Sequence, residues 1–216
     1  MARVLHTYFR SSAAYRVRIA LNLKGLDAEH VFVHLNRNGG EQFDKAFMAI
    51  NPQASVPVLS EPGIQLSQSL AIMEYLDEVY PQNPLLPSSP ADRAFVRQLS
   101  LGIACDIHPL NNLRVLKYLS EFMDVSEEKR SEWIKHWITL GLEALEQHLE
   151  RLDRHGDFCF GNVPTMADCC LVPQVFSAQR FNVDLSRCRK VMAVYAACQA
   201  LPAFAEAQPA RQPDAE

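Results

Sequence analysis

The stretch of sequence that decides the fold is YFRSSAAYRVRIAL, residues 8–21, where an apolar run gives way to a helical pattern through two serines. Serine is a preferred helix N-cap because its oxygen accepts a hydrogen bond from an unpaired backbone N–H of the first turn. The other N–H groups of that turn and the positive end of the helix dipole stabilise an anion. A thiolate at such a position has a lowered pKa. Because this turn contains no cysteine, we expect any thiolate bound there to belong to a ligand.

A proline-entered strand and a second helix start follow downstream. Residues 55–59 read SVPVL, and Pro57 is a poor fit to a central strand. A cis Val56–Pro57 bond would leave the Val56 backbone able to pair with an extended peptide. After a turn at residues 61–63, the run Ser67-Gln68-Ser69 opens another helix. An amide, a hydroxyl and unpaired N–H groups at that point suit a carboxylate.

The remaining pattern divides the chain into an alternating part and a helical part. We predict strands near residues 3–9, 29–35, 56–60 and 64–67, and helices near 12–24, 41–50 and 68–79. The proline-rich residues 81–90 suit an extended linker. Two long helical stretches then follow, residues 91–122, interrupted by Pro109, and residues 126–155. The run TMAD at residues 165–168 matches a capping box, and residues 205–216 are expected to fray.

Together these residues resemble the glutathione transferase family, and the run RSSxxYRVRIAL is similar to its zeta class. The resemblance covers nearly the whole chain. It implies a thioredoxin-like α/β N-terminal domain followed by an all-α C-terminal domain. We expect the glutathione-binding domain at residues 1–82, the linker at 83–88 and the helical substrate-binding domain at 89–216. This chain has Ala13 where many zeta members have cysteine.

The resemblance also implies roles for particular residues. Ser11, supported by Ser12 and with Arg10 beside it, would stabilise the thiolate of glutathione, the implied cofactor. A small dicarboxylate substrate would be held by Arg10, Arg114 and Arg180 converging on one cleft, because guanidinium groups suit planar carboxylates. No metal is implied. The implied glutathione-binding set is Gln42, Gln53, Val56, Gln68, Ser69, His108 and Asn112.

Simpler interpretations stand beside these roles. Ser11 could serve only as a helix cap, and Gln42 could be a solvated residue on a polar helix. His108 could be a helix histidine with its hydrogen bonds satisfied, and each arginine could lie on the surface without a specific role. The arginines nevertheless lie in segments that match the family pattern, such as RFNVDL at residues 180–185.

The activity that the resemblance implies is glutathione-dependent cis–trans isomerisation of maleylacetoacetate to fumarylacetoacetate in aromatic amino-acid catabolism. One alternative is isomerisation of maleylpyruvate, and another is conjugation or dehalogenation of small α-halo acids at the same thiolate site. A non-catalytic binding protein is the third alternative. The presence of Ser11, Pro57, Gln68 and Ser69 counts against it.

Composition narrows the function class further. The 21 basic and 25 acidic residues give a net charge of −4, which argues against a general nucleic-acid-binding protein. We find no apolar run of membrane-span length and no signal-peptide core, so we expect a cytoplasmic protein that binds no membrane. None of the six cysteines forms a C-x-x-C pair, which argues against a disulfide or zinc framework. The resemblance further implies a homodimer.

Overall fold

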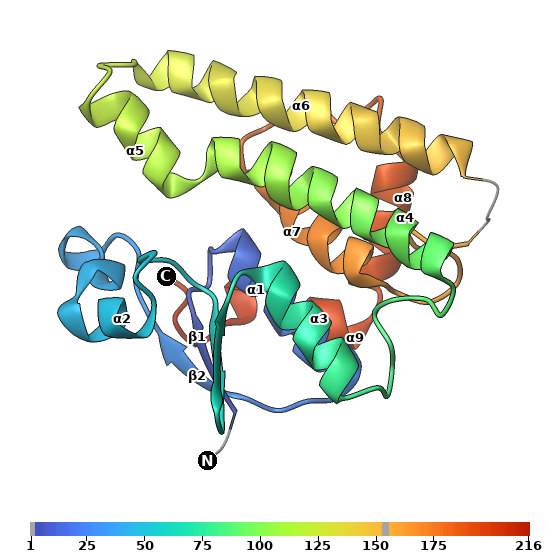
Figure 1. The fold of residues 1–216 in the computed structure, drawn as a ribbon. Coiled ribbons are helices and arrows are strands. Elements are labelled where there is room, and N and C mark those ends of the chain that lie inside the picture. The colour runs from blue at the N-terminus through green and yellow to red at the C-terminus, as the bar shows by residue number, and fades with distance from the viewer. Residues whose placement is uncertain (1–2, 153–155) are drawn as a thin grey trace. The chain divides into compact units, whose positions relative to one another are not determined.

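The computed structural model describes residues 3–152 and 156–216 and divides the chain into two compact units. Unit 1 holds the chain up to Leu85 together with Ala200–Glu216, and unit 2 holds Leu86–Gln199. The ribbon in Figure 1 shows the elements of each unit. The sequence pattern placed residues 200–216 in the helical domain, but here they belong to unit 1. The physical reason is that this segment packs against helix residues of unit 1; for instance, the Asn22 side chain donates a 2.9 Å hydrogen bond to the Ala203 carbonyl.

Unit 1 is built on a four-stranded mixed sheet with the order β2-β1-β3-β4. Strand β1 pairs in parallel with β2 and antiparallel with β3, and β3 pairs antiparallel with β4. Each strand overlaps a predicted one, although β1 and β2 end earlier because the chain turns there into the loops that lead to the next helices. The strands are β1 (Val4–Thr7), β2 (Glu29–Phe32), β3 (Val58–Glu61) and β4 (Ile64–Ser67).

Helices cover both faces of this sheet. On one face Leu5 and Leu59 pack in a core cluster with side chains of α1 (Ser12–Lys24) and α3 (Ser69–Val79). On the other face Val58 packs in a cluster that includes Phe47 of α2 (Lys45–Ile50). Helix α1 ends at Gly25, whose φ of +64° is the left-handed conformation that glycine adopts at low cost. The remaining elements of unit 1 are η1 (Arg37–Gly39), η2 (Glu41–Phe43), α9 (Pro202–Ala205) and η5 (Pro209–Arg211).

The connection between the units is anchored on unit 1. The Lys24 ammonium group contacts the Asp77 carboxylate at 3.0 Å and donates to the carbonyls of Gln82 and Asn83. The Leu85 amide donates to the same Asp77 carboxylate at 2.6 Å, and the Leu85 side chain is buried. The first residues of the expected linker therefore pack on the α/β unit.

The described part of unit 2 is helical. The stretch predicted at residues 91–122 is interrupted earlier than Pro109, because α4 (Pro90–Leu101) gives way at once to the π-helical turn η3 (Gly102–Ile107). Asp168 completes the predicted capping box, since its carboxylate accepts from the Thr165 amide at 2.7 Å. Residues 153–155 of the second predicted stretch lie outside the described residues. The other elements are η4 (His108–Asn111), α5 (Leu113–Glu121), α6 (Glu127–Arg151), α7 (Met166–Arg180) and α8 (Arg189–Gln199).

Two expectations about the chain as a whole can be compared with this structure. Among the described residues, no helix is both long and apolar enough to cross a membrane. All six cysteines are unpaired thiols, and five of them are buried as expected for small hydrophobic residues.

Candidate glutathione and substrate sites

The junction of β1 and α1 presents the predicted thiolate-binding turn. Ser11 has extended backbone angles, and its Oγ accepts a 3.2 Å hydrogen bond from the Ala14 amide. The amides of Ser12 and Ala13 come too early in the helix to have an intrahelical acceptor. Arg10 is exposed, with its Cζ 4.9 Å from the centroid of the Phe9 ring. A capped helix start with spare N–H groups therefore lies where the serine motif predicted it.

A buried arginine that sequence reasoning missed holds this turn in place. Arg18 is 2% exposed, and its guanidinium donates to Thr7 Oγ1 at 3.0 Å and to the carbonyls of Tyr8 and Phe9 at 3.3 and 3.0 Å. Burial lowers the pKa of Arg18 to about 10, and the charge of Asp214 opposes that shift. The available signal was a charged residue inside the otherwise apolar helical run.

The start of α3 is the position predicted to hold a carboxylate. Gln68 immediately precedes the helix and has a φ of +72°, a strained conformation for a residue with a side chain. The Gln68 side-chain amide donates a hydrogen bond to Gln53 Oε1 at 2.9 Å. Ser69 is 5% exposed, and its Oγ accepts a 3.2 Å hydrogen bond from the buried guanidinium of Arg16. Because an arginine only donates, Ser69 can direct its own proton to another acceptor. A cation and a hydroxyl at a helix start suit a carboxylate.

The loop between these two helix starts is braced by a residue that sequence reasoning also missed. Asn51 is 3% exposed. Its side-chain Nδ2 donates to the Ser55 carbonyl at 2.8 Å, and its Oδ1 accepts from the Gln53 backbone amide at 3.1 Å. The Val56–Pro57 bond is cis, as predicted, and the Val56 side chain is buried. Asn51 thereby fixes the segment that leads into the proposed peptide-pairing position.

Gln42 lies inside the protein rather than on a solvated surface. It is 5% exposed and donates a 3.3 Å hydrogen bond to the Leu35 carbonyl. Its Oε1 is buried and has no hydrogen-bond partner among the described residues. Gly40 has a φ of +114°, which L side chains rarely adopt, and a Cβ there would lie 2.5 Å from Gln42 Nε2, so a larger residue would be strained and would displace the Gln42 side chain. The interpretation of Gln42 as a solvated residue is wrong, and its role toward glutathione stays a prediction.

The other predicted site residues belong to unit 2. His108 opens η4, and Asn112 caps α5 by accepting a 3.2 Å hydrogen bond from the Arg114 amide. Arg114 and Arg180 are exposed, and the Arg180 Cζ lies 4.5 Å from the centroid of the Phe181 ring. The structure thus gathers His108, Asn112 and Arg114 in one segment. The expected convergence of Arg10, Arg114 and Arg180 involves both units and stays a prediction.

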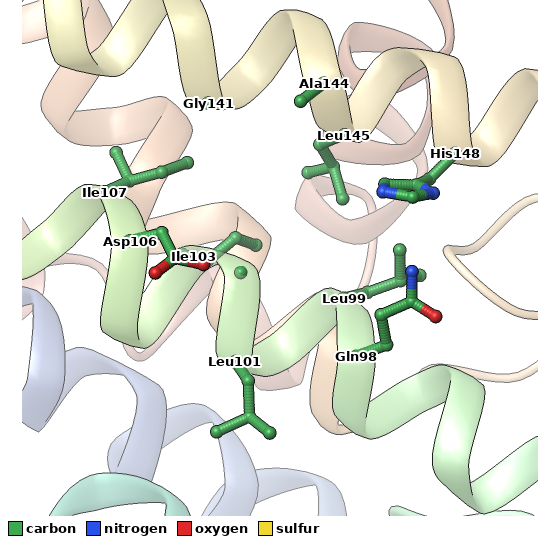
Figure 2. Close-up of a pocket in the computed structure, with 11 residues that line it drawn as sticks. Gln98, Leu99, Leu101, Ile103, Asp106, Ile107, Gly141, Ala144, Leu145 and His148 are labelled. Carbon is green, nitrogen blue, oxygen red and sulfur yellow. The ribbon is translucent and has the colours of Figure 1, made fainter.

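Unit 2 also contains a cavity of about 480 Å³ between α6 and the α4–η3 segment (Figure 2). Its lining is mainly apolar, with the polar side chains of Gln98, Asp106 and His148 at its edges. No predicted site residue lines this cavity, so it does not coincide with the predicted glutathione or carboxylate positions. The lining residues are Gln98, Leu99, Leu101, Gly102, Ile103, Asp106, Ile107, Gly141, Ala144, Leu145 and His148.

Comparison with known proteins places both units in one family. Residues 3–78 match the family model for the glutathione S-transferase N-terminal domain, and residues 135–201 match that for the C-terminal domain. A probable maleylacetoacetate isomerase from Vibrio cholerae is 50% identical over 217 residues, covering 100% of this chain and 99% of its own length.

Solved structures agree with the sequence comparison. The holo structure of maleylpyruvate isomerase, a bacterial glutathione S-transferase of the zeta class, has a TM-score of 0.95 and 45% identity, covering 98% of this chain and 99% of its own. A maleylacetoacetate isomerase from Methylobacterium extorquens AM1, solved with bound malonate and glutathione, has a TM-score of 0.93 and 40% identity with the same coverage.

Proposed function

Since the chain belongs to the zeta class of the glutathione transferase family, we propose that it is a glutathione-dependent isomerase that converts maleylacetoacetate to fumarylacetoacetate in aromatic amino-acid catabolism. The observation that carries the proposal is the pair of helix starts in unit 1, one capped by Ser11 and one formed by Ser69 over the buried Arg16. The first suits a thiolate and the second suits a carboxylate.

The residues of unit 1 fit glutathione in charge and in hydrogen-bonding capacity. We propose that the Ser11 hydroxyl donates to the sulfur, supported by the amides of Ser12 and Ala13. Ser69 and Gln68 hold the γ-glutamyl carboxylate, and the buried Arg16 charge adds to the field at that helix start. Glutathione supplies a thiolate whose reversible addition to the substrate double bond permits rotation about it.

The remaining groups of the proposed set act on the peptide part of glutathione and on the substrate. Gln42, Gln53 and Val56 contact the cysteinyl and glycyl portions, and His108 and Asn112 complete the glutathione set. Arg10, Arg114 and Arg180 hold the carboxylates of the substrate. Catalysis by these residues is positioning plus electrostatic stabilisation of developing negative charge. A structural relative that was solved with malonate, a small dicarboxylate, and glutathione supports this substrate class.

Maleylpyruvate is a second candidate substrate, because the zeta-class neighbour with a TM-score of 0.95 is named for that activity. Assaying both maleyl compounds side by side with glutathione tests the choice. We expect the larger kcat/KM for maleylacetoacetate; a larger value for maleylpyruvate would exchange the two assignments. Turnover of α-halo acids alone would support a conjugating or dehalogenating transferase. We further propose that the protein is cytoplasmic and a homodimer, in line with the family resemblance.

The first prediction concerns glutathione binding at α3. Ser69→Ala removes the hydroxyl that accepts a hydrogen bond from Arg16, and Gln68→Ala removes the side-chain amide that donates to Gln53. We expect each variant to bind glutathione about tenfold more weakly in calorimetric titration, since a hydrogen bond to a charged group contributes about 1.5–3 kcal/mol. The control is Ser120→Ala, at a partly exposed serine of α5 whose hydroxyl donates to the Lys117 carbonyl of its own helix. Equal affinity in the wild type and both variants would contradict this assignment.

A further inference from the structure

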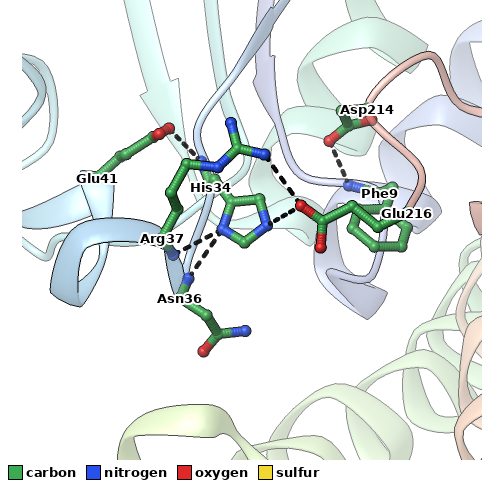
Figure 3. A network of polar contacts seen from close by, with 7 residues as sticks. All are labelled: Phe9, His34, Asn36, Arg37, Glu41, Asp214 and Glu216. Carbon is green, nitrogen blue, oxygen red and sulfur yellow. Dashed lines mark hydrogen bonds and ion pairs between the residues drawn. The ribbon is translucent and has the colours of Figure 1, made fainter.

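The last residues of the chain form an ordered segment of unit 1 rather than a frayed tail. After α9, residues 207–216, which we name the C-terminal strap, run through η5 and are fixed to the β1–α1 junction at two points. The Ala207 carbonyl accepts a 3.2 Å hydrogen bond from Arg18 Nε, and Asp214 Oδ2 accepts a 2.9 Å hydrogen bond from the Phe9 amide. Figure 3 shows the Asp214 carboxylate directed at the Phe9 nitrogen.

Asp214 and Arg18 bind the same loop between β1 and α1, Asp214 through a backbone N–H group and Arg18 through backbone carbonyl groups. The Arg18 guanidinium binds the Tyr8 and Phe9 carbonyls, and Asp214 binds the Phe9 amide. The two side chains also attract one another, because the Asp214 charge favours the cationic form of the buried Arg18. Phe9 lies two residues before Ser11, so the strap constrains the backbone that carries the proposed thiolate-stabilising hydroxyl.

The strap also reaches the neighbouring loop after β2. Strands β1 and β2 run parallel, and the Val33 amide donates to the Thr7 carbonyl at 2.9 Å, so the loops after them start side by side. Glu216 Oε1 lies 3.0 Å from Arg37 Nη2 and 3.1 Å from His34 Nε2 (Figure 3). His34 Nδ1 accepts from the amides of Asn36 and Arg37, which leaves the ring proton on Nε2, facing Glu216.

These two attachments differ in strength. The Glu216 side chain is 52% exposed, and its contact with His34 Nε2 lacks the geometry of a hydrogen bond. Exposed ion pairs contribute little because water and salt screen them. Asp214 is partly buried, accepts a 2.9 Å hydrogen bond from a backbone amide and interacts electrostatically with the buried Arg18. Asp214 is therefore the main anchor of the strap.

We infer that the C-terminal strap positions the thiolate-binding turn, with Asp214 as a positioning residue for Ser11. The inference rests on the proposed function, because it takes Ser11 to act on the glutathione sulfur. Asp214 need not contact glutathione or substrate for this role. It acts by holding the Phe9 amide, so that the Ser11 hydroxyl and the first amides of α1 keep one orientation.

Asp214→Ala tests the inference, with the thiol pKa of bound glutathione read from thiolate absorbance against pH. Loss of a negative charge near the sulfur would by itself lower that pKa. Loss of the positioned donor would raise it, so the sign separates the two effects. We expect Asp214→Ala to raise the thiol pKa, to lower kcat/KM about tenfold and to speed amide hydrogen exchange at Phe9.

Two further variants complete the experiment. Asp214→Asn keeps an oxygen that can accept from the Phe9 amide, so it should retain slow exchange at Phe9 and a thiol pKa at or below the wild-type value. It also tests the role if Asp214→Ala does not fold. Arg211→Gln alters an exposed side chain of the strap that pairs with the exposed Glu206, and it should match the wild type. Unchanged thiol pKa and Phe9 exchange in Asp214→Ala, or a raised thiol pKa with slow exchange in Asp214→Asn, would overturn the inference. A wild-type protein that does not bind glutathione would instead refute the proposed function.

Discussion

Two buried arginines of α1 lie behind the two helix starts of unit 1. Arg16 donates to Ser69 at the start of α3, and Arg18 donates to the loop that precedes Ser11. Residues two apart on an α-helix are separated by about 200° around its axis, so one helix directs these side chains to opposite sides. Each guanidinium fixes one polar loop from within the protein. Helix α1 therefore organises both proposed ends of the glutathione site.

The role of Ser11 is testable because its two functions can be separated. Ser11→Ala removes a donor to a thiolate, worth about 1–3 kcal/mol, and should raise the thiol pKa of bound glutathione by about one to two units. It also removes the cap of α1, which lowers stability by about 1 kcal/mol. Spectroscopic titration of the thiolate measures the first effect.

Controls for this experiment use other capping residues. Ser126→Ala removes the cap of α6, where the hydroxyl accepts from the Lys129 amide at 3.3 Å, and should leave the thiol pKa unchanged. Ser11→Thr keeps both a cap and a hydroxyl and should behave like the wild type. An unchanged titration in Ser11→Ala would transfer the role to Ser12 or to the backbone amides.

At the scale of single residues, local signals could be predicted and distant partners could not. The Ser11 cap follows from its immediate neighbours in sequence, and the poor fit of Pro57 to a central strand points to the cis Val56–Pro57 bond. Arg18 and Asp214 act on residues brought together only by folding, the second from 205 positions away in the chain. A single sequence contains no periodic or spacing signal for such a pair, which explains why the strap was expected to fray.

At the scale of elements, one helix of unit 2 caps another. Glu146 of α6 is 5% exposed, and its two carboxylate oxygens accept from the amides of Lys190 and Val191, each at 2.8 Å. These amides lie in the first turn of α8, which otherwise has no intrahelical acceptor for them. The negative charge also faces the positive end of the α8 dipole. Glu146 thus replaces the local capping residue that α8 would otherwise need.

Removing this cap should destabilise unit 2. We expect Glu146→Ala to lower the free energy of unfolding by about 2–4 kcal/mol, because it leaves the buried Val191 amide and the partly buried Lys190 amide unpaired. The melting temperature by calorimetry would measure the loss. Glu143 lies on α6 like Glu146 and pairs with the exposed Arg187, and we expect Glu143→Gln to change stability by less than about 0.5 kcal/mol. A similar effect of both variants would show that the Glu146 contacts add nothing beyond a surface charge.

Helix positions could be predicted better than the way in which helices end. The acidic start of α6 and the Thr165–Asp168 box have short-range sequence signatures, and both are found. The break after α4 comes at Gly102 rather than at Pro109, and Ile107 of that segment packs against Gly141 of α6, where a Cβ would lie 2.2 Å from Ile107 Cγ1. This close approach depends on a residue of another helix and leaves no local signal.

At the scale of the whole molecule, the chain leaves unit 1 at Leu85 and returns to it at Ala200. The proposed glutathione site is divided accordingly, with Ser11, Gln68 and Ser69 in unit 1 and His108 and Asn112 in unit 2. The proposed carboxylate-binding arginines are divided in the same way. We therefore propose that unit 1 supplies most of the glutathione contacts, and that Arg114 and Arg180 of unit 2 join Arg10 of unit 1 in binding the substrate.

Arg114 and Arg180 test that division. A substrate with a carboxylate at each end needs separate cationic partners, so we expect Arg114→Ala and Arg180→Ala each to lower kcat/KM for the maleyl substrate by about 10–100-fold, equivalent to about 1.5–3 kcal/mol per charged contact. Glutathione affinity should change little, because neither arginine belongs to the proposed glutathione-binding set. Arg187→Ala, another exposed arginine of that unit, should retain wild-type kinetics. If Arg114→Ala and Arg180→Ala also isomerise maleyl substrates with wild-type efficiency, the dicarboxylate substrate class is wrong, and a conjugating transferase becomes the better account of the same thiolate site.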